Sequence, residues 1–183
     1  MKKKLFYGLL LIVLVITALF VYEGMAFKRY LTHQKGGDMN IPINNLAPVK
    51  SEGEIEISAP VNQVWQVLTN IDNWPSWQTE VTEAHLLGEL EEGTSFKWKA
   101  GGLHFSSNIH TIVPKTSFGW TGKTIGASAV HNWYFEEQAG KTVVRVEESL
   151  QGVFPRLFSR YFQKNLDKGI QQNLTDLKMA SEK

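Results

Sequence analysis

The sequence predicts an α+β fold: an antiparallel sheet of about seven strands and a long C-terminal helix, preceded by one transmembrane helix. Three observations predict it. An apolar run fills residues 5–22, alternating apolar and polar segments follow one another closely between residues 54 and 150, and a helical pattern runs from Pro155 to about Ala180. Short gaps between the strands favour antiparallel neighbours, because parallel strands need long crossover connections.

The apolar run is interrupted only by Gly8 and Thr17. As a helix it would be about 27 Å long, enough to cross the hydrocarbon core of a bilayer. Lys2, Lys3 and Lys4 precede it, and positive charge tends to stay in the cytoplasm. We therefore expect a single-pass protein of the cell membrane, with a cytoplasmic N-terminus and its domain on the extracytoplasmic side.

A cleaved signal peptide is the alternative, with cleavage near Gly24-Met25-Ala26 and secretion of the domain. The apolar run is longer than a usual signal core, which favours an uncleaved anchor. The expected division is therefore a cytoplasmic stub and transmembrane helix in residues 1–29, a flexible linker in residues 30–50 and one domain in residues 51–183. Glycine, proline and asparagine deny the linker regular structure.

The domain begins with a strand followed by a helix. Residues 54–57 alternate charged and apolar side chains, which is the period of a half-buried strand. Ser58 is expected to cap the helix, and Pro60 suits its first turn. Four apolar residues then follow the helical i, i+3, i+4, i+7 spacing: Val61, Val64, Trp65 and Leu68.

Six further strands are expected at residues 81–87, 94–100, 103–113, 117–123, 128–138 and 141–150. Glycine- and proline-containing turns separate them. The last helix carries an apolar face made of Phe158, Phe162, Leu166, Ile170, Leu174 and Leu177. A basic row lies opposite, in Arg156, Arg160, Lys164 and Lys168; it is either a solvated face or a contact for anionic lipid headgroups. Gly169 sits near the apolar face, where a strand or a ligand could need the room, although a local bend without function explains it equally well.

Four motifs along residues 51–182 resemble one family. They are Ala59-Pro60 with Val64-Trp65, the Trp74-Pro75-Ser76-Trp77 turn, Glu148 with Gly152, and Gly169 with residues 177–182. In this order they resemble the SRPBCC superfamily (START/Bet v 1-like, polyketide cyclase/dehydrase branch). The resemblance implies a helix-grip fold, in which a curved sheet wraps around the long C-terminal helix and leaves an apolar cavity. Such proteins bind lipids, sterols, polyketides or other hydrophobic molecules, and some catalyse reactions in the cavity.

The last hairpin permits a register prediction. If Ala139-Gly140 is a two-residue turn, Gln138 pairs with Lys141, and His131 then lies opposite Glu148 on the concave face. A carboxylate on an apolar face needs a partner. This pair is therefore either a satisfied polar spot, or the anchor for a ligand's polar end or an acid–base pair in catalysis. By the same alternation Asn132, Glu136, Arg145 and Glu147 should point to solvent.

Apolar side chains at strand and helix spacing are the candidate wall of a hydrophobic site. The ligand-binding candidates are Phe96, Trp98, Phe105, Ile109, Phe118, Trp120, Trp133, Phe135, Val144, Val146, Phe162 and Gly169. Aromatic residues in such patterns more often form a core, but their number here leaves material for a cavity wall.

Other chemistries lack a signal. Residues 51–183 carry 12 Lys and Arg against 16 Asp and Glu, which argues against nucleic acid as a partner. His104 and His110 should face outward without a third ligand, so no metal site is expected. The sequence has no phosphate loop, no nucleophile elbow and no cysteine, and no cofactor is expected.

Three functions remain open. The first is a membrane-anchored module that binds a hydrophobic small molecule or lipid between the sheet and the last helix. The second is an enzyme of the cyclase/dehydratase or hydrolase type that uses His131 and Glu148. The third is a protein-interaction domain with a filled core. A buried contact between His131 and Glu148 would favour the enzyme over the carrier, and tryptophans that close the cavity would favour the interaction domain.

Overall fold

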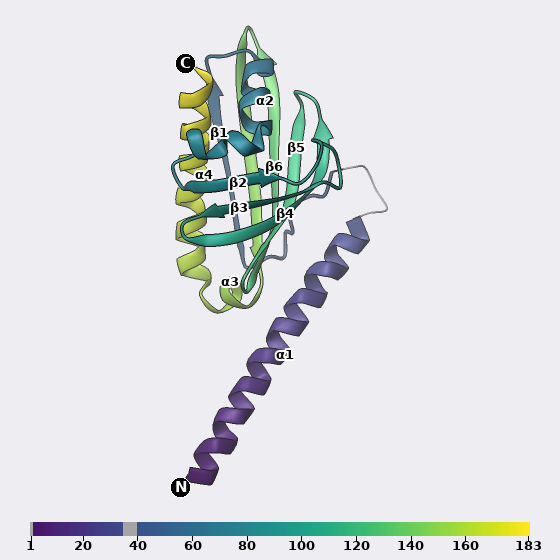
Figure 1. Cartoon of the computed structure of the whole chain (residues 1–183), viewed down its shortest axis with the longest axis vertical. Helices are drawn as coiled ribbons and strands as arrows, with labels where there is room; N and C mark the ends of the chain where they lie inside the picture. Colours follow the sequence, from purple (N-terminus) through teal and green to yellow (C-terminus); the bar gives the residue numbers. More distant parts are fainter. Residues whose placement is uncertain (1, 35–39) are drawn as a thin grey trace.

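The computed structural model describes residues 2–34 and 40–183 (Figure 1). One seven-stranded antiparallel sheet has the order β1-β7-β6-β5-β4-β3-β2, so strands β2 to β7 form a meander and β1 joins it beside the last strand. The predicted fold class is confirmed. The strands are β1 (Val49–Ile57), β2 (Val81–Leu86), β3 (Ser95–Ala100), β4 (Leu103–Val113), β5 (Ser117–Thr124), β6 (Ala127–Gln138) and β7 (Lys141–Gln151).

The long helix α4 (Ser159–Ser181) lies along the sheet and contacts β1 most extensively. The close approach is made possible by Gly53 of β1. A Cβ atom there would lie 2.8 Å from Leu174 Cδ1 and 2.9 Å from Ile170 Cγ2. The room expected at Gly169 is not used in this way, because no atom lies within 4 Å of a Cβ built at that position. The glycine that the helix–sheet contact requires is therefore on the strand.

Helix α2 (Val61–Thr69) and the 3-10 helix η1 (Ile71–Ser76) cover another part of the concave face. Val64 and Leu68 are fully buried, and the Trp74 indole donates a hydrogen bond to the carbonyl of Leu68 at 2.7 Å. The expected cap at Ser58 is wrong. Because the helix begins at Val61, Pro60 occupies the cap position, and Ser58 instead donates its backbone N–H to Glu182.

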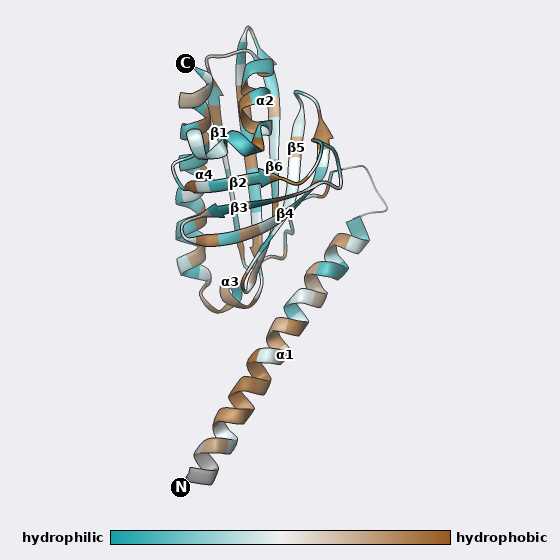
Figure 2. Ribbon diagram, viewed as in Figure 1, coloured by the Kyte–Doolittle hydropathy of each residue, from teal (hydrophilic) through white to brown (hydrophobic). Residues whose placement is uncertain are grey.

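Helix α1 (Lys2–Gln34) is longer than the predicted span. Its N-terminal half projects beyond the domain and is the most apolar part of the chain (Figure 2). Among the described residues it is the one helix long and apolar enough to cross a membrane; a signal sequence would pass the same test.

The second half of α1 packs on the domain. Phe20 makes an edge-to-face contact with Phe154 of the short helix α3 (Val153–Leu157), with ring centroids 5.8 Å apart. Phe27 is buried, and Glu23 accepts a hydrogen bond from Arg156 of α3. The spacing of these side chains places them on one face of α1.

The linker predicted for residues 30–50 has different ends in the structure. Residues 30–34 belong to α1, and β1 begins at Val49. Residues 40–44 lie against the outer face of the sheet, where Asn44 donates to Gln151 at 2.6 Å and the Ile41 carbonyl accepts from Asn132 at 3.0 Å. Residues 35–39 lie outside the described residues, so flexibility there stays a prediction.

This packing also corrects the outward-facing residues of the hairpin. Asn132 is only 1% exposed, and Glu147 accepts hydrogen bonds from Asn132 and from the Tyr134 hydroxyl. Both do face away from the cavity, as predicted. They are nevertheless not solvated, because residues 40–44 cover this part of the outer face.

Candidate functional site: a cavity under the C-terminal helix

The hairpin β6–β7 has the predicted register. Ala139 and Gly140 form the two-residue turn, with positive φ angles of 51° and 81°, as a type I′ turn requires. Gln138 pairs with Lys141, and His131 lies opposite Glu148. The hairpin therefore brings an imidazole and a carboxylate together on the concave face.

His131 and Glu148 form a buried pair. His131 Nδ1 lies 2.8 Å from Glu148 Oε2, and the two side chains are only 7% and 15% exposed. The His131 ring stacks on Trp120, with centroids 4.4 Å apart, and lies parallel to Trp133 at 5.5 Å. The carboxylate and the two indoles together fix the orientation of the imidazole.

The second ring nitrogen of His131, Nε2, is the atom of the pair that a ligand could bind. His131 Nε2 is buried and has no hydrogen-bond partner among the described residues. Because Nδ1–H donates to Glu148, a neutral ring presents Nε2 as an acceptor, and a protonated ring presents it as a donor. A ligand hydroxyl, phenol or carbonyl could therefore hydrogen-bond at this position.

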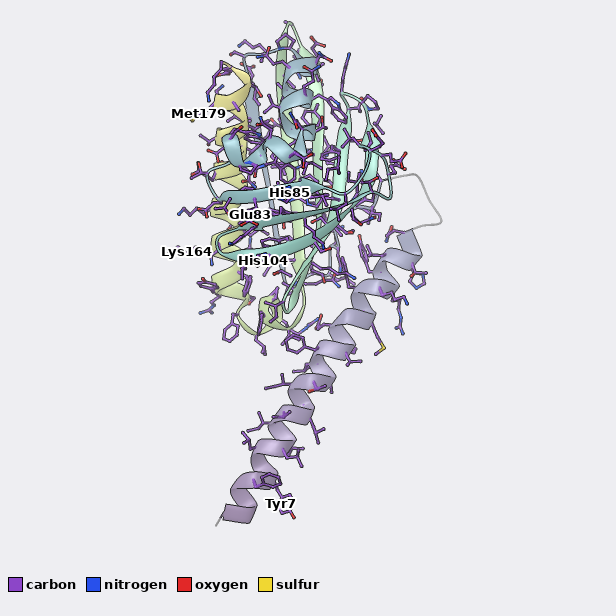
Figure 3. All side chains as sticks on the ribbon, viewed as in Figure 1. Tyr7, Glu83, His85, His104, Lys164 and Met179 are labelled. Atoms are coloured by element: carbon purple, nitrogen blue, oxygen red, sulfur yellow. The ribbon has the colours of Figure 1, made fainter. Side chains whose placement is uncertain are left out.

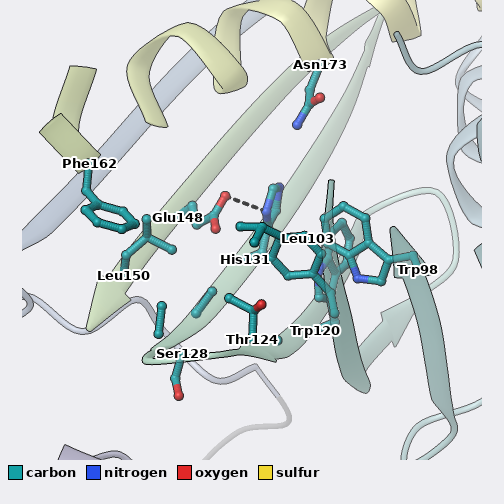
Figure 4. A pocket seen from close by; sticks show the side chains of 14 residues that line it. Trp98, Leu103, Trp120, Thr124, Ser128, His131, Glu148, Leu150, Phe162 and Asn173 are labelled. Carbon is teal, nitrogen blue, oxygen red and sulfur yellow. Dashed lines mark ion pairs between the residues drawn. The ribbon is translucent and has the colours of Figure 1, made fainter. Parts of the chain in front are cut away.

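A cavity of about 220 Å³ opens beside this pair, between the sheet and α4 (Figure 4). Its wall is largely apolar. The lining residues are Trp98, Leu103, Phe105, Trp120, Gly122, Thr124, Ala127, Ser128, Ala129, His131, Glu148, Leu150, Phe162 and Asn173. An apolar cavity of about 150 Å³ can hold benzene, so this cavity has room for a larger apolar group.

The structure brings only some of the predicted site residues to this cavity. His131, Glu148, Trp98, Phe105, Trp120 and Phe162 line it. The remaining strand residues pack in the core instead: Phe96, Ile109, Phe118, Trp133, Phe135, Val144 and Val146. Gly169 lies on α4 and does not line the cavity.

Two tryptophans explain this division of the concave face. Trp65 of α2 lies with its ring centroid 5.5 Å from that of Phe135 and 6.1 Å from that of Phe118. The ring centroid of Trp74 of η1 lies 5.5 Å from that of Phe96. Trp65 therefore fills the concave face toward the turn of the β6–β7 hairpin, and Trp74 packs beside the cavity residues Trp98 and Trp120, with ring centroids 5.9 and 5.5 Å away. The open half is therefore the part that lies under α4 between Phe162 and Asn173.

Asn173 is the functional candidate that sequence reasoning missed. Its amide points from α4 toward the His131 ring (Figure 4). A signal was present, because Asn173 lies seven residues after Leu166 and three after Ile170, on the apolar face of the helix. A polar residue at such a position faces either the core or a cavity.

His110 lies on the outer face of the sheet and takes no part in the cavity. A Cβ atom at Gly119 would lie 2.6 Å from both the His110 ring and the Asn132 side chain, so these groups converge over that glycine. Burial lowers the pKa of His110 to about 4, although a hydrogen bond to the Trp120 backbone opposes the shift.

Comparison with known proteins assigns the domain to a family. The family model for polyketide cyclase / dehydrase and lipid transport matches residues 48–182. The chain belongs to this family. No curated protein sequence matches the chain.

Several solved structures show the same fold as this polyketide cyclase/dehydrase family domain. A hypothetical protein of Helicobacter pylori has a TM-score of 0.67 at 17% identity, over 75% of this chain and 90% of that one. The Zhui aromatase/cyclase from Streptomyces sp. R1128 has a TM-score of 0.65 at 12% identity, over 73% and 93%. A START superfamily protein from Mycobacterium smegmatis has a TM-score of 0.56 at 12% identity, over 73% and 94%.

Proposed function

We propose that this family member binds a hydrophobic small molecule, or the apolar part of a lipid, in the cavity under α4. The observation that carries the proposal is the cavity itself: about 220 Å³, walled by aromatic and aliphatic side chains, with one buried polar group, His131 Nε2, left without a partner among the described residues. Ligand sites commonly combine an apolar wall with a few placed polar groups. The ligand would be apolar with a single hydroxyl, phenol or carbonyl at its polar end.

Native mass spectrometry of the full-length protein in detergent, followed by organic extraction, tests this function. We expect a co-purifying apolar molecule that is lost in Ala129→Trp, because Ala129 lines the cavity and an indole there would fill it. Thr175→Trp, at an exposed position of α4, is the matched control and should retain the molecule. A protein that is empty and takes up no fatty acid, sterol or aromatic polyketide would move the assignment to a protein-interaction domain.

The second part of the proposal is that α1 anchors the domain to the cell membrane, with the N-terminus in the cytoplasm and the domain outside. The apolar half of α1 and the three lysines before it support this. Because the chain has no cysteine, Lys3→Cys and Met179→Cys variants can be labelled with an impermeant maleimide in intact cells. Labelling at 179 but not at 3 is expected. Release of a shortened protein into the medium would show signal cleavage instead.

An acid–base enzyme is the second candidate, and one observation favours it. The His131–Glu148 contact is buried, as a general base held by a carboxylate would be. The family is described as polyketide cyclase / dehydrase and lipid transport, and an aromatase/cyclase, the Zhui protein, is among the solved structures with the same fold. The extracted ligand decides between the two functions: turnover of that ligand that is lost in His131→Gln while binding persists would establish the enzyme, and unchanged ligand after incubation would establish the carrier.

A further inference from the structure

Four exposed apolar side chains gather at the end of the domain from which α1 projects. They are Ile125 in the β5–β6 turn, Leu157 and Phe158 at the end of α3, and Tyr161 at the start of α4, with exposed fractions of 72%, 60%, 56% and 68%. We call these four residues the apolar rim. Large apolar side chains exposed together on one end of a domain indicate a partner.

The turn and the two helices of the rim are held together by close packing. The Phe154 backbone N–H donates to the Gly126 carbonyl at 3.2 Å, and a Cβ atom at Gly126 would lie 2.5 Å from the Phe154 ring. The rings of Tyr161 and Phe162 are in edge contact at 5.6 Å. The rim is therefore one surface, built on fixed backbone.

The apolar helix α1 leaves the domain beside this surface. Its contacts with α3 are made by Phe20 and Glu23, which lie where the apolar run of residues 5–22 ends. Residues 6–18 are exposed and extend away from the domain. If that part of α1 spans a bilayer, the rim lies at the level where the helix enters the headgroup layer (Figure 1).

Charge at this end suits a lipid surface. Residues 152–166 carry Arg156, Arg160 and Lys164 and no acidic residue. Arg156 is paired with Glu23, and Arg160 and Lys164 are exposed. Figure 3 shows Lys164 on the lower half of the domain, the half from which the free part of α1 projects, and Met179 near the opposite end. Basic side chains beside apolar ones are typical of a surface that rests on anionic headgroups.

The cavity reaches the same end of the molecule. Thr124, Ala127 and Ser128 line the cavity under α4, and they also line a hollow beside Phe20 and Glu23 of α1. Phe162, next to the rim residue Tyr161, lies in the cavity wall. The end of the cavity at Thr124, Ala127 and Ser128 therefore lies next to the rim.

We infer that the apolar rim inserts into the interfacial layer of the membrane that α1 enters, so that the cavity exchanges its ligand directly with the bilayer. The inference rests on the proposed membrane anchoring and ligand binding. It adds the orientation of the domain on the membrane and the source of the ligand.

Depth measurements on the full-length protein in phosphatidylglycerol-containing nanodiscs test this arrangement. The cysteine-free chain accepts single spin labels at Ile125→Cys and Phe158→Cys in the rim, at Met179→Cys as a distant exposed control, and at Ile12→Cys as an anchor control. Collisions with oxygen, which is enriched in the bilayer, are compared with those of a water-soluble nickel complex. Both rim labels should lie about 5–10 Å into the headgroup and acyl boundary, with the Met179 label in water.

The controls separate the two levels of the proposal. If the Ile12 label is in the bilayer and both rim labels behave like the Met179 label, the rim does not insert and the inference is overturned while the anchor stands. If the Ile12 label is itself in water, the anchoring is overturned and the inference with it. Ligand retention in the Ala129→Trp experiment is independent of both results.

Discussion

Glu23 of α1 and Arg156 of α3 form an ion pair that joins the apolar N-terminal helix to the domain. The Glu23 carboxylate is 6% exposed, whereas the Arg156 side chain is 54% exposed. Glu23 is the first residue after the apolar run of α1. A buried carboxylate at this position needs its partner, so the pair holds α1 in register against α3.

Loss of the arginine should release the docked half of α1. In Arg156→Met the Glu23 carboxylate stays buried without its charge partner, and local opening becomes easier. Hydrogen exchange of residues 20–34 in nanodiscs should rise by about tenfold or more, whereas exchange in β6 and β7 should be unchanged. Arg160→Met, at an exposed position four residues later, is the control; an equal effect of that change would refute a specific role for the pair.

The buried pair of the cavity should respond to the loss of its carboxylate. Glu148→Leu leaves His131 Nδ1 without an acceptor and should lower the free energy of unfolding by about 1–3 kcal/mol. Glu148→Gln keeps an acceptor oxygen and should lower it less. Urea denaturation in detergent measures both values. Glu137→Leu, exposed on the same hairpin, should stay within about 0.5 kcal/mol of the parent.

Replacement by alanine should have opposite effects at Gly53 of β1 and at Gly169 of α4. Gly53→Ala places a Cβ atom against Leu174 and Ile170 and should destabilise the protein by about 1–3 kcal/mol. Gly169→Ala meets no atom within 4 Å and should stabilise it by about 0.5–1 kcal/mol, because alanine favours the helix. The same denaturation series compares them. A destabilising Gly169→Ala would restore a packing role for that glycine.

Stability should fall in mild acid because of His110. Its pKa is about 4 in the folded protein against 6.5 in the unfolded chain, so the unfolded state binds more protons between these values. Above pH 6.5 the buried neutral ring makes its full contribution to the free energy of unfolding. About 3 kcal/mol of that free energy is lost as the pH falls to about 4. His110→Gln should flatten this part of the profile of unfolding free energy against pH. His104→Gln, exposed on the same strand, should leave it unchanged.

Local pattern was enough to predict most of the fold. The strands β2 to β7 agree with the predicted segments to within one residue at each end, because alternation identifies a strand and glycine-containing turns mark its limits. The pairing of His131 with Glu148 was predictable for a further reason. A two-residue turn fixes the register of a hairpin, and the register fixes which side chains meet.

These local patterns did not predict which distant segments pack together. The sequence placed twelve residues around a cavity, but Trp65 and Trp74 fill one half of the concave face, and only tertiary contacts decide which half. Asn173 joins the site for the same reason, since α4 carries it over His131. The covering of Asn132 by residues 40–44, far away along the chain, is equally non-local.

The sequence by itself determined strands β2 to β7, most of the last helix, the apolar span and the one hairpin register on which the candidate site depends, because each follows from the period of side chains within a short segment. It missed the first half of β1 and the break at Phe158 between α3 and α4. The tertiary structure decided where the cavity lies, which polar groups reach it, and that α1 docks beside one end of it through Glu23 and Arg156. Those features depend on which non-adjacent surfaces pack together, and burial between such surfaces leaves no periodic signal in the chain.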